Sequence, residues 1–221
     1  TLTLSGNADT AFAGGLSGVA AGGLTKTGTG TLTLSGDSDG FLGATTISAG
    51  TVIAQNGSAL GDASAVTVEA GATLSLGASE TIGTLAGDAS VGALAAASVD
   101  LGAHTLTLSG NADTAFAGII SGTDGGLTKS GTGTLTLTGA NTYTGATTVS
   151  GGTLALNHPG GDALSDVTAV TVDAGATLSL GASETIGTLA GTAATAVVNV
   201  GAHTLTLSGN ADTAFAGGLS G

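Results

Sequence analysis

One pair of carboxylates in the sequence has a spacing that could support acid catalysis. Asp37 and Asp39 lie two residues apart in the segment GDSDG, so an extended backbone would place both on one side. Asp and Ser beside Gly are also ordinary turn formers, because their side chains bond to nearby backbone groups. The matching part of the second half of the chain lacks both carboxylates. We therefore interpret this segment as a turn, and we expect no catalytic residue.

Calcium is the metal that the acidic residues would suit best, since it prefers hard oxygen ligands. Asp37, Asp39, Asp162 and Asp166 could supply such ligands, and GGDALSD at residues 160–166 faintly resembles the Gly- and Asp-rich motif of calcium-binding β-rolls. The segment lacks the second Gly and is not repeated in tandem. A single partial motif supplies too few oxygens, so we predict no metal site and no cofactor, and weak calcium binding stays an open alternative.

The three histidines, two lysines and three recurring phenylalanines have simpler structural interpretations. Zinc binding would require His104, His203 and His158 to converge, yet four turns of about 4.8 Å would separate the first two by roughly 19 Å. We expect these histidines at the edges of turns. Lys26 and Lys129 recur at one place in the repeat, and we expect them to be solvated at strand ends. Three phenylalanines recur at another place, and we expect them to be packed at corners: Phe12, Phe116 and Phe215.

Composition excludes several classes of function. The 221 residues include 42 Gly and no Cys, Met or Arg, and 15 acidic residues against 2 Lys give a net charge of −13. Nucleic-acid binding needs cations that replace phosphate counterions, so we exclude a nucleic-acid partner. No uninterrupted apolar stretch reaches the length of a membrane span, and we expect no membrane insertion by this segment. A hydrophobic fraction of 41% indicates a chain that folds.

A long internal repeat dominates the sequence. The segment TLTLSGNADTAFAG begins at Thr1, Thr105 and Thr204, and residues 65–87 return as residues 169–191 with one difference, Glu69 against Asp173. We divide the chain into a first unit at residues 1–104, a second at 105–203 and the start of a third at 204–221, all within one continuous solenoid. The absence of Met and of an export signal leads us to expect an excerpt of a longer array.

The elements that must position these residues are short strands. Segments such as Thr31-Leu32-Thr33-Leu34 alternate apolar and polar residues between Gly-, Asn- and Asp-rich turns, so Leu should point inward and Thr outward. No helical stripe is present, and we predict an all-β chain. Near-verbatim repetition favours a parallel β-helix over a sandwich. Apolar anchors at Leu2, Leu32 and equivalent positions predict eight turns spanning roughly 40 Å.

Length differences between the units are expected in loops. They fall at residues 55–64 against 157–168, and at residues 88–101 against 192–200. Surface loops accommodate such changes more easily than strands do.

The segment GGLTKSGTGTLTLTGANTYTGATTVSGGTLAL at residues 125–156 closely resembles the autotransporter-associated β-strand repeat, also called the passenger-associated transport repeat. A weaker copy covers residues 22–54, where residues 37–42 replace Asn141-Thr142-Tyr143-Thr144 with one additional residue. The resemblance implies a right-handed parallel β-helix, exported through an outer-membrane barrel and then secreted or displayed on the bacterial surface.

The resulting expectation is a structural stalk, scaffold or filament segment of an adhesin-type protein, not an enzyme. Its expected partners are neighbouring repeat units, other copies in fibres or matrix, and a surface carbohydrate or protein receptor. The first alternative is a β-helix enzyme acting on an extracellular polysaccharide, which would need a clustered acidic groove. The second is an ice-binding adhesin segment with outward Thr-x-Thr pairs. The pairs Thr1/Thr3 and Thr31/Thr33 fit that pattern, whereas Thr51/Ile53 and Thr73/Ser75 break it.

Overall fold

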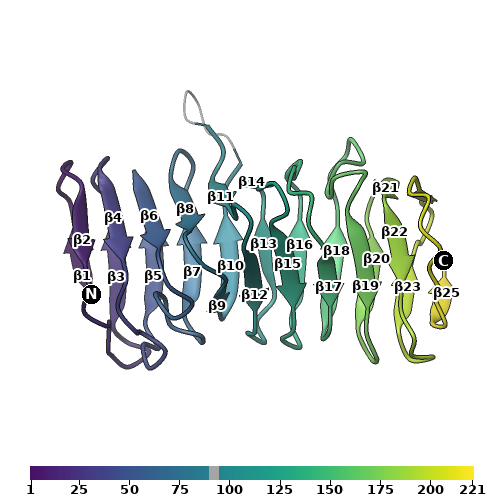
Figure 1. Cartoon of the computed structure of the whole chain (residues 1–221), viewed down its shortest axis with the longest axis horizontal. Coiled ribbons are helices and arrows are strands. Elements are labelled where there is room, and N and C mark those ends of the chain that lie inside the picture. Colours follow the sequence, from purple (N-terminus) through teal and green to yellow (C-terminus); the bar gives the residue numbers. More distant parts are fainter. Residues whose placement is uncertain (90–94) are drawn as a thin grey trace.

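The computed structural model describes residues 1–89 and 95–221, and within them every regular element is a β-strand. Successive turns of the chain lie side by side along the long axis, with the two chain ends at opposite ends of the molecule (Figure 1). All strand pairs whose register is known are parallel. The chain therefore forms a β-solenoid, and the predicted all-β parallel coil is confirmed.

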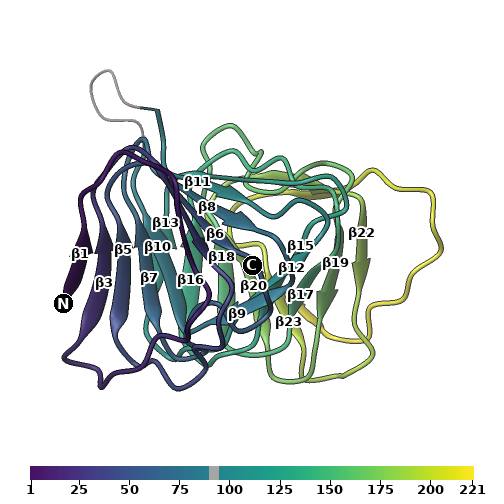
Figure 2. The same cartoon turned by 60° about the vertical axis from the view of Figure 1, so that its left-hand side comes forward.

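The coil has three sides, seen obliquely in Figure 2. Side one is an 11-stranded sheet that runs the length of the chain. Its strands are β1 (Leu2–Leu4), β3 (Gly23–Lys26), β5 (Ala44–Ile47), β7 (Ala65–Val68), β10 (Thr84–Gly87), β13 (Thr114–Phe116), β16 (Thr134–Leu137), β18 (Thr153–Leu156), β20 (Thr177–Leu180), β23 (Val197–Asn199) and β25 (Gly218–Ser220).

Side two begins as a six-stranded sheet and ends as a two-stranded one. Between these sheets it passes through residues 142–144 and 162–164, linked by bonds such as Thr142 N–H to the Ile120 carbonyl at 2.9 Å. Its strands are β2 (Thr10–Phe12), β4 (Thr31–Leu34), β6 (Thr51–Ala54), β8 (Thr73–Leu76), β11 (Ser98–Asp100), β14 (Ile119–Ser121), β21 (Glu184–Ile186) and β24 (Leu205–Leu207).

Side three begins without regular strands, at the bridge between Gly18 and Phe41, and continues through residues 59–61. A six-stranded sheet follows. Its strands are β9 (Glu80–Ile82), β12 (Thr105–Leu108), β15 (Gly126–Lys129), β17 (Thr147–Val149), β19 (Ala169–Val172) and β22 (Thr188–Ala190).

The number of turns differs from the prediction. Eleven strands on side one correspond to ten turns, about 48 Å at the spacing of neighbouring strands. Turn length varies from 19 residues, between Leu135 and Leu154, to 29 residues, between Gly87 and Phe116. The prediction of eight turns was wrong because the apolar anchors do not share one side. Leu2 lies on side one, Leu32 on side two and Leu106 on side three.

The repeat unit does not contain a whole number of turns. The identical segments at Thr1, Thr105 and Thr204 form β1 on side one, β12 on side three and β24 on side two. From each copy to the next the chain passes fourteen sides, which is four and two-thirds turns. Successive units are therefore rotated about the axis, and the same sequence faces three different directions.

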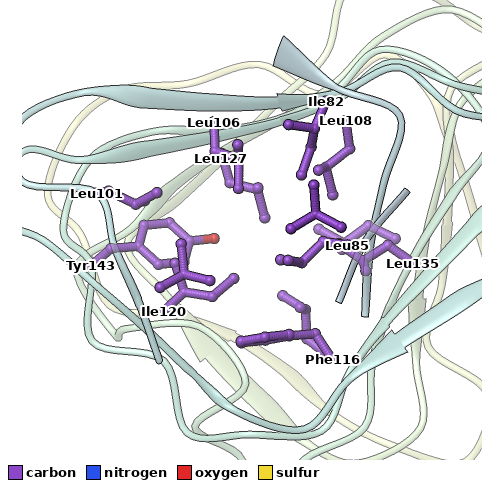
Figure 3. Packing of buried hydrophobic residues seen from close by; sticks show 14 of the residues in the cluster. Ile82, Leu85, Leu101, Leu106, Leu108, Phe116, Ile120, Leu127, Leu135 and Tyr143 are labelled. Carbon is purple, nitrogen blue, oxygen red and sulfur yellow. The ribbon is translucent and has the colours of Figure 1, made fainter. Parts of the chain in front are cut away.

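Side chains alternate as the sequence predicts. In β4, β8 and β16 the leucines are buried and the threonines or serines between them are partly exposed. Stacked leucines, valines and isoleucines fill the interior together with Phe116 and Tyr143 (Figure 3). This narrow core leaves no room for a second layer, so each turn depends on the turns before and after it.

The expected loops are confirmed in one place and partly wrong in the other. Residues 55–64 and 157–168 lie between strands, as predicted. The segment 88–101 contains β11, and its counterpart 192–200 contains β23, so the length difference falls only in the preceding part of each segment. Residues 90–94 of that prediction lie outside the described residues.

Replacing Leu135 with Asp tests the assignment of the interior. Leu135 is 1% exposed, whereas the adjacent Thr134 in β16 points outward. Leu135→Asp would bury an unpaired charge and should lower the free energy of unfolding by about 3 kcal/mol or more, whereas Thr134→Asp should cost about 1 kcal/mol or less. Urea denaturation of both variants measures the difference. Equal losses would contradict the assignment.

Candidate functional site

The structure buries two glutamates, which the sequence analysis did not single out. Glu80 and Glu184 occupy equivalent places at the start of β9 and β21, and each is 2% exposed. Each alternates with an inward isoleucine in the segment Glu-Thr-Ile, and that alternation was the available signal. A carboxylate at an apolar, inward position requires partners, because burying an unpaired charge is costly.

Backbone N–H groups of the preceding turn provide those partners. Oε1 of Glu80 accepts the N–H of Leu60 at 2.8 Å, and Oε2 accepts the N–H of Ala59 at 3.2 Å. Glu184 binds Leu164 and Ala163 in the same way, at 2.9 and 3.2 Å. Residues 59–60 and 163–164 are not in regular strands. The carboxylate therefore replaces the missing ladder bonds and joins one turn to the next.

Burial raises the pKa of both glutamates to about 7. The backbone N–H bonds act in the opposite direction, because they stabilise the ionised carboxylate, and nearby Asp62 and Asp39 or Asp162 and Asp166 raise the pKa a little further. Burial of a charge in the solenoid interior is the largest of these effects. Both glutamates thus titrate near neutral pH.

The side chains of an asparagine and a serine also connect successive turns, the first on side two and the second on side three. Oδ1 of Asn141 accepts the N–H of Ile120 at 2.7 Å, and its Nδ2 donates to the carbonyl of Ala163 at 2.6 Å. One amide thereby links three successive turns. In the first unit, Oγ of Ser38 accepts the N–H of Leu16 at 2.9 Å. Ser38 and Asn141, which differ between the two repeat copies, are therefore both structural connectors.

Tyr143 belongs to the core. It is 0% exposed, and its hydroxyl lies 2.7 Å from Oγ1 of buried Thr147. Figure 3 shows the hydroxyl pointing into the interior near Ile120 and Leu127. Burial raises the pKa of Tyr143, so the phenol stays neutral and hydrogen-bonded.

The prediction that Lys26 and Lys129 are solvated was wrong. They are 2% and 3% exposed, because each occupies an inward position in its strand, after a buried leucine. Nζ of Lys129 donates to the carbonyl of Gly131 at 2.5 Å, and Lys26 bonds to Gly28 in the same way. Burial lowers the pKa of both lysines, opposed by Asp113 and Asp9 respectively. Each ammonium group thereby donates a hydrogen bond to the backbone of the corner that follows its own strand.

Because both lysines are buried, the outer surface carries negative charge only. Both lysines and two of the 15 acidic residues are inside, so thirteen acidic residues remain outside with no Lys or Arg to pair with. They lie mostly at corners, whereas most outward positions of the sheets carry Thr, Ser, Ala or Gly. The exceptions include Ile53, Ile119, Asn199 and one acidic residue, Asp100. The exterior is anionic along the corners and nearly uncharged along the sides.

Asp37 and Asp39 lie in the exposed turn that the sequence indicated. Oδ1 of Asp37 accepts the N–H of Asp39 at 3.2 Å, which is the local bond of a turn-forming aspartate. The pKa of neighbouring Asp62 is raised, first by burial and then by Asp39 and Asp37. Asp162 and Asp166 border an open cavity of about 360 Å³ with Asn141 and Ser165. Among residues 1–89 and 95–221, no three His, Asp or Glu side chains form a metal-binding group.

The histidines and phenylalanines lie apart along the coil. His104 precedes β12 on side three and His203 precedes β24 on side two, so they occupy different corners. His158 accepts the N–H of Asp162 through Nδ1 at 3.4 Å. Phe116 is fully buried, as expected for corner packing, whereas Phe12 in the first turn is 44% exposed.

A glutamine substitution at both buried carboxylates tests their titration. Because the folded-state pKa of about 7 exceeds the unfolded value of 4.5, the folded state binds more protons in between, and the free energy of unfolding should fall as pH rises from about 4.5 to 7. Glu80→Gln/Glu184→Gln should flatten that slope in urea denaturation followed across this range. Glu69→Gln, which removes a partly exposed carboxylate, is the matched control and should keep the wild-type slope. An unchanged slope in the double variant would refute the buried titration.

Two segments match a protein-family model described as the Passenger-associated-transport-repeat, residues 24–54 and 127–156. They contain β4 to β6 and β16 to β18, with most of β3 and β15, and each includes a buried lysine and the Ser38 or Asn141 turn. Searches of curated proteins and of solved structures find no match to the chain. The structure has no helix, among its described residues, of the length and apolarity needed to cross a membrane. The chain is thus a β-solenoid that carries two passenger-associated transport repeats, consistent with autotransporter passenger domains.

Proposed function

We propose that this chain is a structural segment, a stalk or spacer, in the exported passenger of a large bacterial autotransporter of the adhesin type. The repeat family implies secretion or display at the bacterial surface. The observation that carries the proposal is the unbroken sheet of side one, which extends a narrow rod through ten turns. A rod of this kind converts chain length into distance from the cell at about 4.8 Å per turn.

The polar groups support a scaffold role. Glu80, Glu184 and Asn141 use their hydrogen-bonding groups on backbone partners in adjacent turns, which leaves them poorly placed to act on a substrate. Asp37 and Asp39, the best acid pair of the sequence, lie at an exposed turn of one unit only. The alternative of a polysaccharide-cleaving enzyme also lacks an exposed Lys or Arg to stabilise an anionic intermediate.

Ice binding is a weaker alternative. The reason is the placement of the threonines in the coil, in addition to the interrupted Thr-x-Thr pattern of the sequence. The Thr-x-Thr pairs lie on different sides, and the register instead stacks single threonines on side three: Thr81, Thr107, Thr128, Thr148 and Thr171. The neighbouring outward column includes Gly126 and Ala169 in place of Thr. A surface that orders water as a lattice would need both columns, so we expect no thermal hysteresis.

Rotation of the units also favours a spacer over a one-sided adhesive. Identical segments face three directions, so a recognition surface encoded in the repeat would not accumulate along one side. Contacts with receptors or matrix would then involve single units and not a continuous face.

Surface display tests the spacer role. The chain, with an N-terminal epitope, is fused before an autotransporter barrel in one or two copies, and epitope height is measured by fluorescence distance to the membrane. We expect export and an increase of about 48 Å for the second copy. Leu127→Asp should abolish display, whereas Thr128→Asp, on the outward face of the same strand, should not. Unchanged height, or glycan cleavage that Asp37→Ala abolishes, would contradict the proposal.

A further inference from the structure

The loop at residues 55–64 contains the only Asn-Gly pair of the chain, Asn56-Gly57, and the six other asparagines precede Ala, Thr, His or Val. An asparagine loses its side-chain amide when the backbone nitrogen of the next residue attacks its Cγ. Glycine permits this attack most readily, because it has no side chain to hinder the approach and the widest choice of backbone angles. Asn56 is half-buried and Gly57 is exposed, and neither belongs to a strand. Water therefore has access to the reacting groups.

The side chain of Asn56 is already turned toward the attacking nitrogen. Its Oδ1 accepts the N–H of Ser58 at 3.0 Å, and because this bond spans Gly57, Cγ lies next to the backbone nitrogen of Gly57. Negative charge develops on Oδ1 during the attack, and the N–H of Ser58 stabilises it. The N–H of Gly57 donates none of the backbone hydrogen bonds formed among the described residues, so the attack breaks no such bond.

A second hydrogen bond gives the same amide a structural role. Nδ2 of Asn56 donates to the carbonyl of Ser35 at 2.7 Å. Ser35 directly follows β4 and Asn56 lies two residues after β6, so the side chain continues the link between two turns beyond the end of their paired strands. An ionised carboxylate only accepts hydrogen bonds, and it would place a negative charge beside the Ser35 carbonyl. Loss of the amide thus removes a bond between turns.

We propose that Asn56-Gly57 is a self-modification site, at which loss of one amide uncouples the loop at residues 55–64 from the turn before it. The nitrogen of Gly57 gives its proton to water and bonds to Cγ of Asn56. The Cγ–Nδ2 bond breaks, and the amide nitrogen takes up a proton and leaves as ammonia. Water then opens the cyclic imide at either carbonyl, which gives aspartate or isoaspartate. One water is consumed and one ammonia released. This reaction goes beyond the spacer role, because it assigns a reactive site to the rod.

The loop has other bonds that survive the reaction. Glu80 of the next turn holds the N–H groups of Ala59 and Leu60. On the side of the preceding turn, the carbonyl of Ser58 accepts the N–H of Ser38 at 2.6 Å. The coil should therefore remain folded after modification, while the loop opens locally more often than before.

Asn199 is a matched control within the same chain. Its Oδ1 accepts the N–H of Gly201 at 3.1 Å, the same turn geometry as at Asn56, and its side chain is exposed. The next residue is Val200, whose β-branched side chain hinders the approach of its backbone nitrogen. In the first unit Asp100 occupies the equivalent place and makes the same bond to Gly102, so a carboxylate is accommodated there.

Peptide mass spectrometry tests the reaction. The full chain is incubated at mildly alkaline pH in water enriched in heavy oxygen, and a urea-unfolded sample gives the reference rate for the sequence alone. We expect Asn56 of the folded chain to take up heavy oxygen as aspartate and isoaspartate, at a rate comparable with that of the unfolded chain, while Asn199 keeps its amide. A folded chain that keeps the Asn56 amide as long as the Asn199 amide would overturn the proposal.

Two aspartate variants test the uncoupling. Asn56→Asp and Asn199→Asp each add one negative charge, but only the first loses a hydrogen bond between turns. Hydrogen exchange at the N–H groups of residues 58–60 should be about fivefold faster in Asn56→Asp than in the wild type, as expected for the loss of one hydrogen bond. It should be unchanged in Asn199→Asp, and circular dichroism should show both variants folded. Equal exchange rates in the two variants would contradict the uncoupling.

Discussion

The hydrogen-bond ladder between successive turns is the interaction on which the rest of this structure depends. Each strand donates to and accepts from the turns before and after it, and each inward leucine or valine packs on the equivalent residues of those turns. A turn without a regular strand must satisfy its backbone in another way, because unpaired buried N–H groups are costly. Glu80 and Glu184 lie in the turns that follow such places, Asn141 lies in one itself, and their side chains supply acceptors for backbone N–H groups of the preceding turn.

This requirement explains why charged residues lie inside so narrow a core. A carboxylate can accept two backbone N–H groups at once, and a lysine ammonium can reach a carbonyl at the corner beyond its own strand. Most interior positions therefore hold apolar side chains, and a few hold polar side chains that connect one turn to the next. As a result the exterior loses its only lysines, so the acidic corners repel one another, which favours a soluble, extended rod.

Much of the fold could be predicted from the sequence. Alternation in Thr31-Leu32-Thr33-Leu34 gave both the strand and its buried face, and the long repeat indicated a solenoid. The number of turns could not be predicted, because turn length varies and the anchor residues fall on three sides. Lys129 was misassigned because its inward position depends on the strand extending from Leu127, and charge alone suggested solvent. Glu184 was missed for a related reason: its partners lie in the preceding turn, about twenty residues away.

Distances along side one test the ten-turn coil most directly. Thr25, Thr136 and Ser179 lie in one outward column, in the second, seventh and ninth strands of that side. Spin labels on Thr25 and Thr136 should be about 24 Å apart, and labels on Thr25 and Ser179 about 34 Å apart, at 4.8 Å per turn. Pulsed electron-electron double resonance on the two doubly labelled chains measures both distances. An increase of about 10 Å between the pairs supports the coil as described, whereas equal distances, or a second distance shorter than the first, would contradict it.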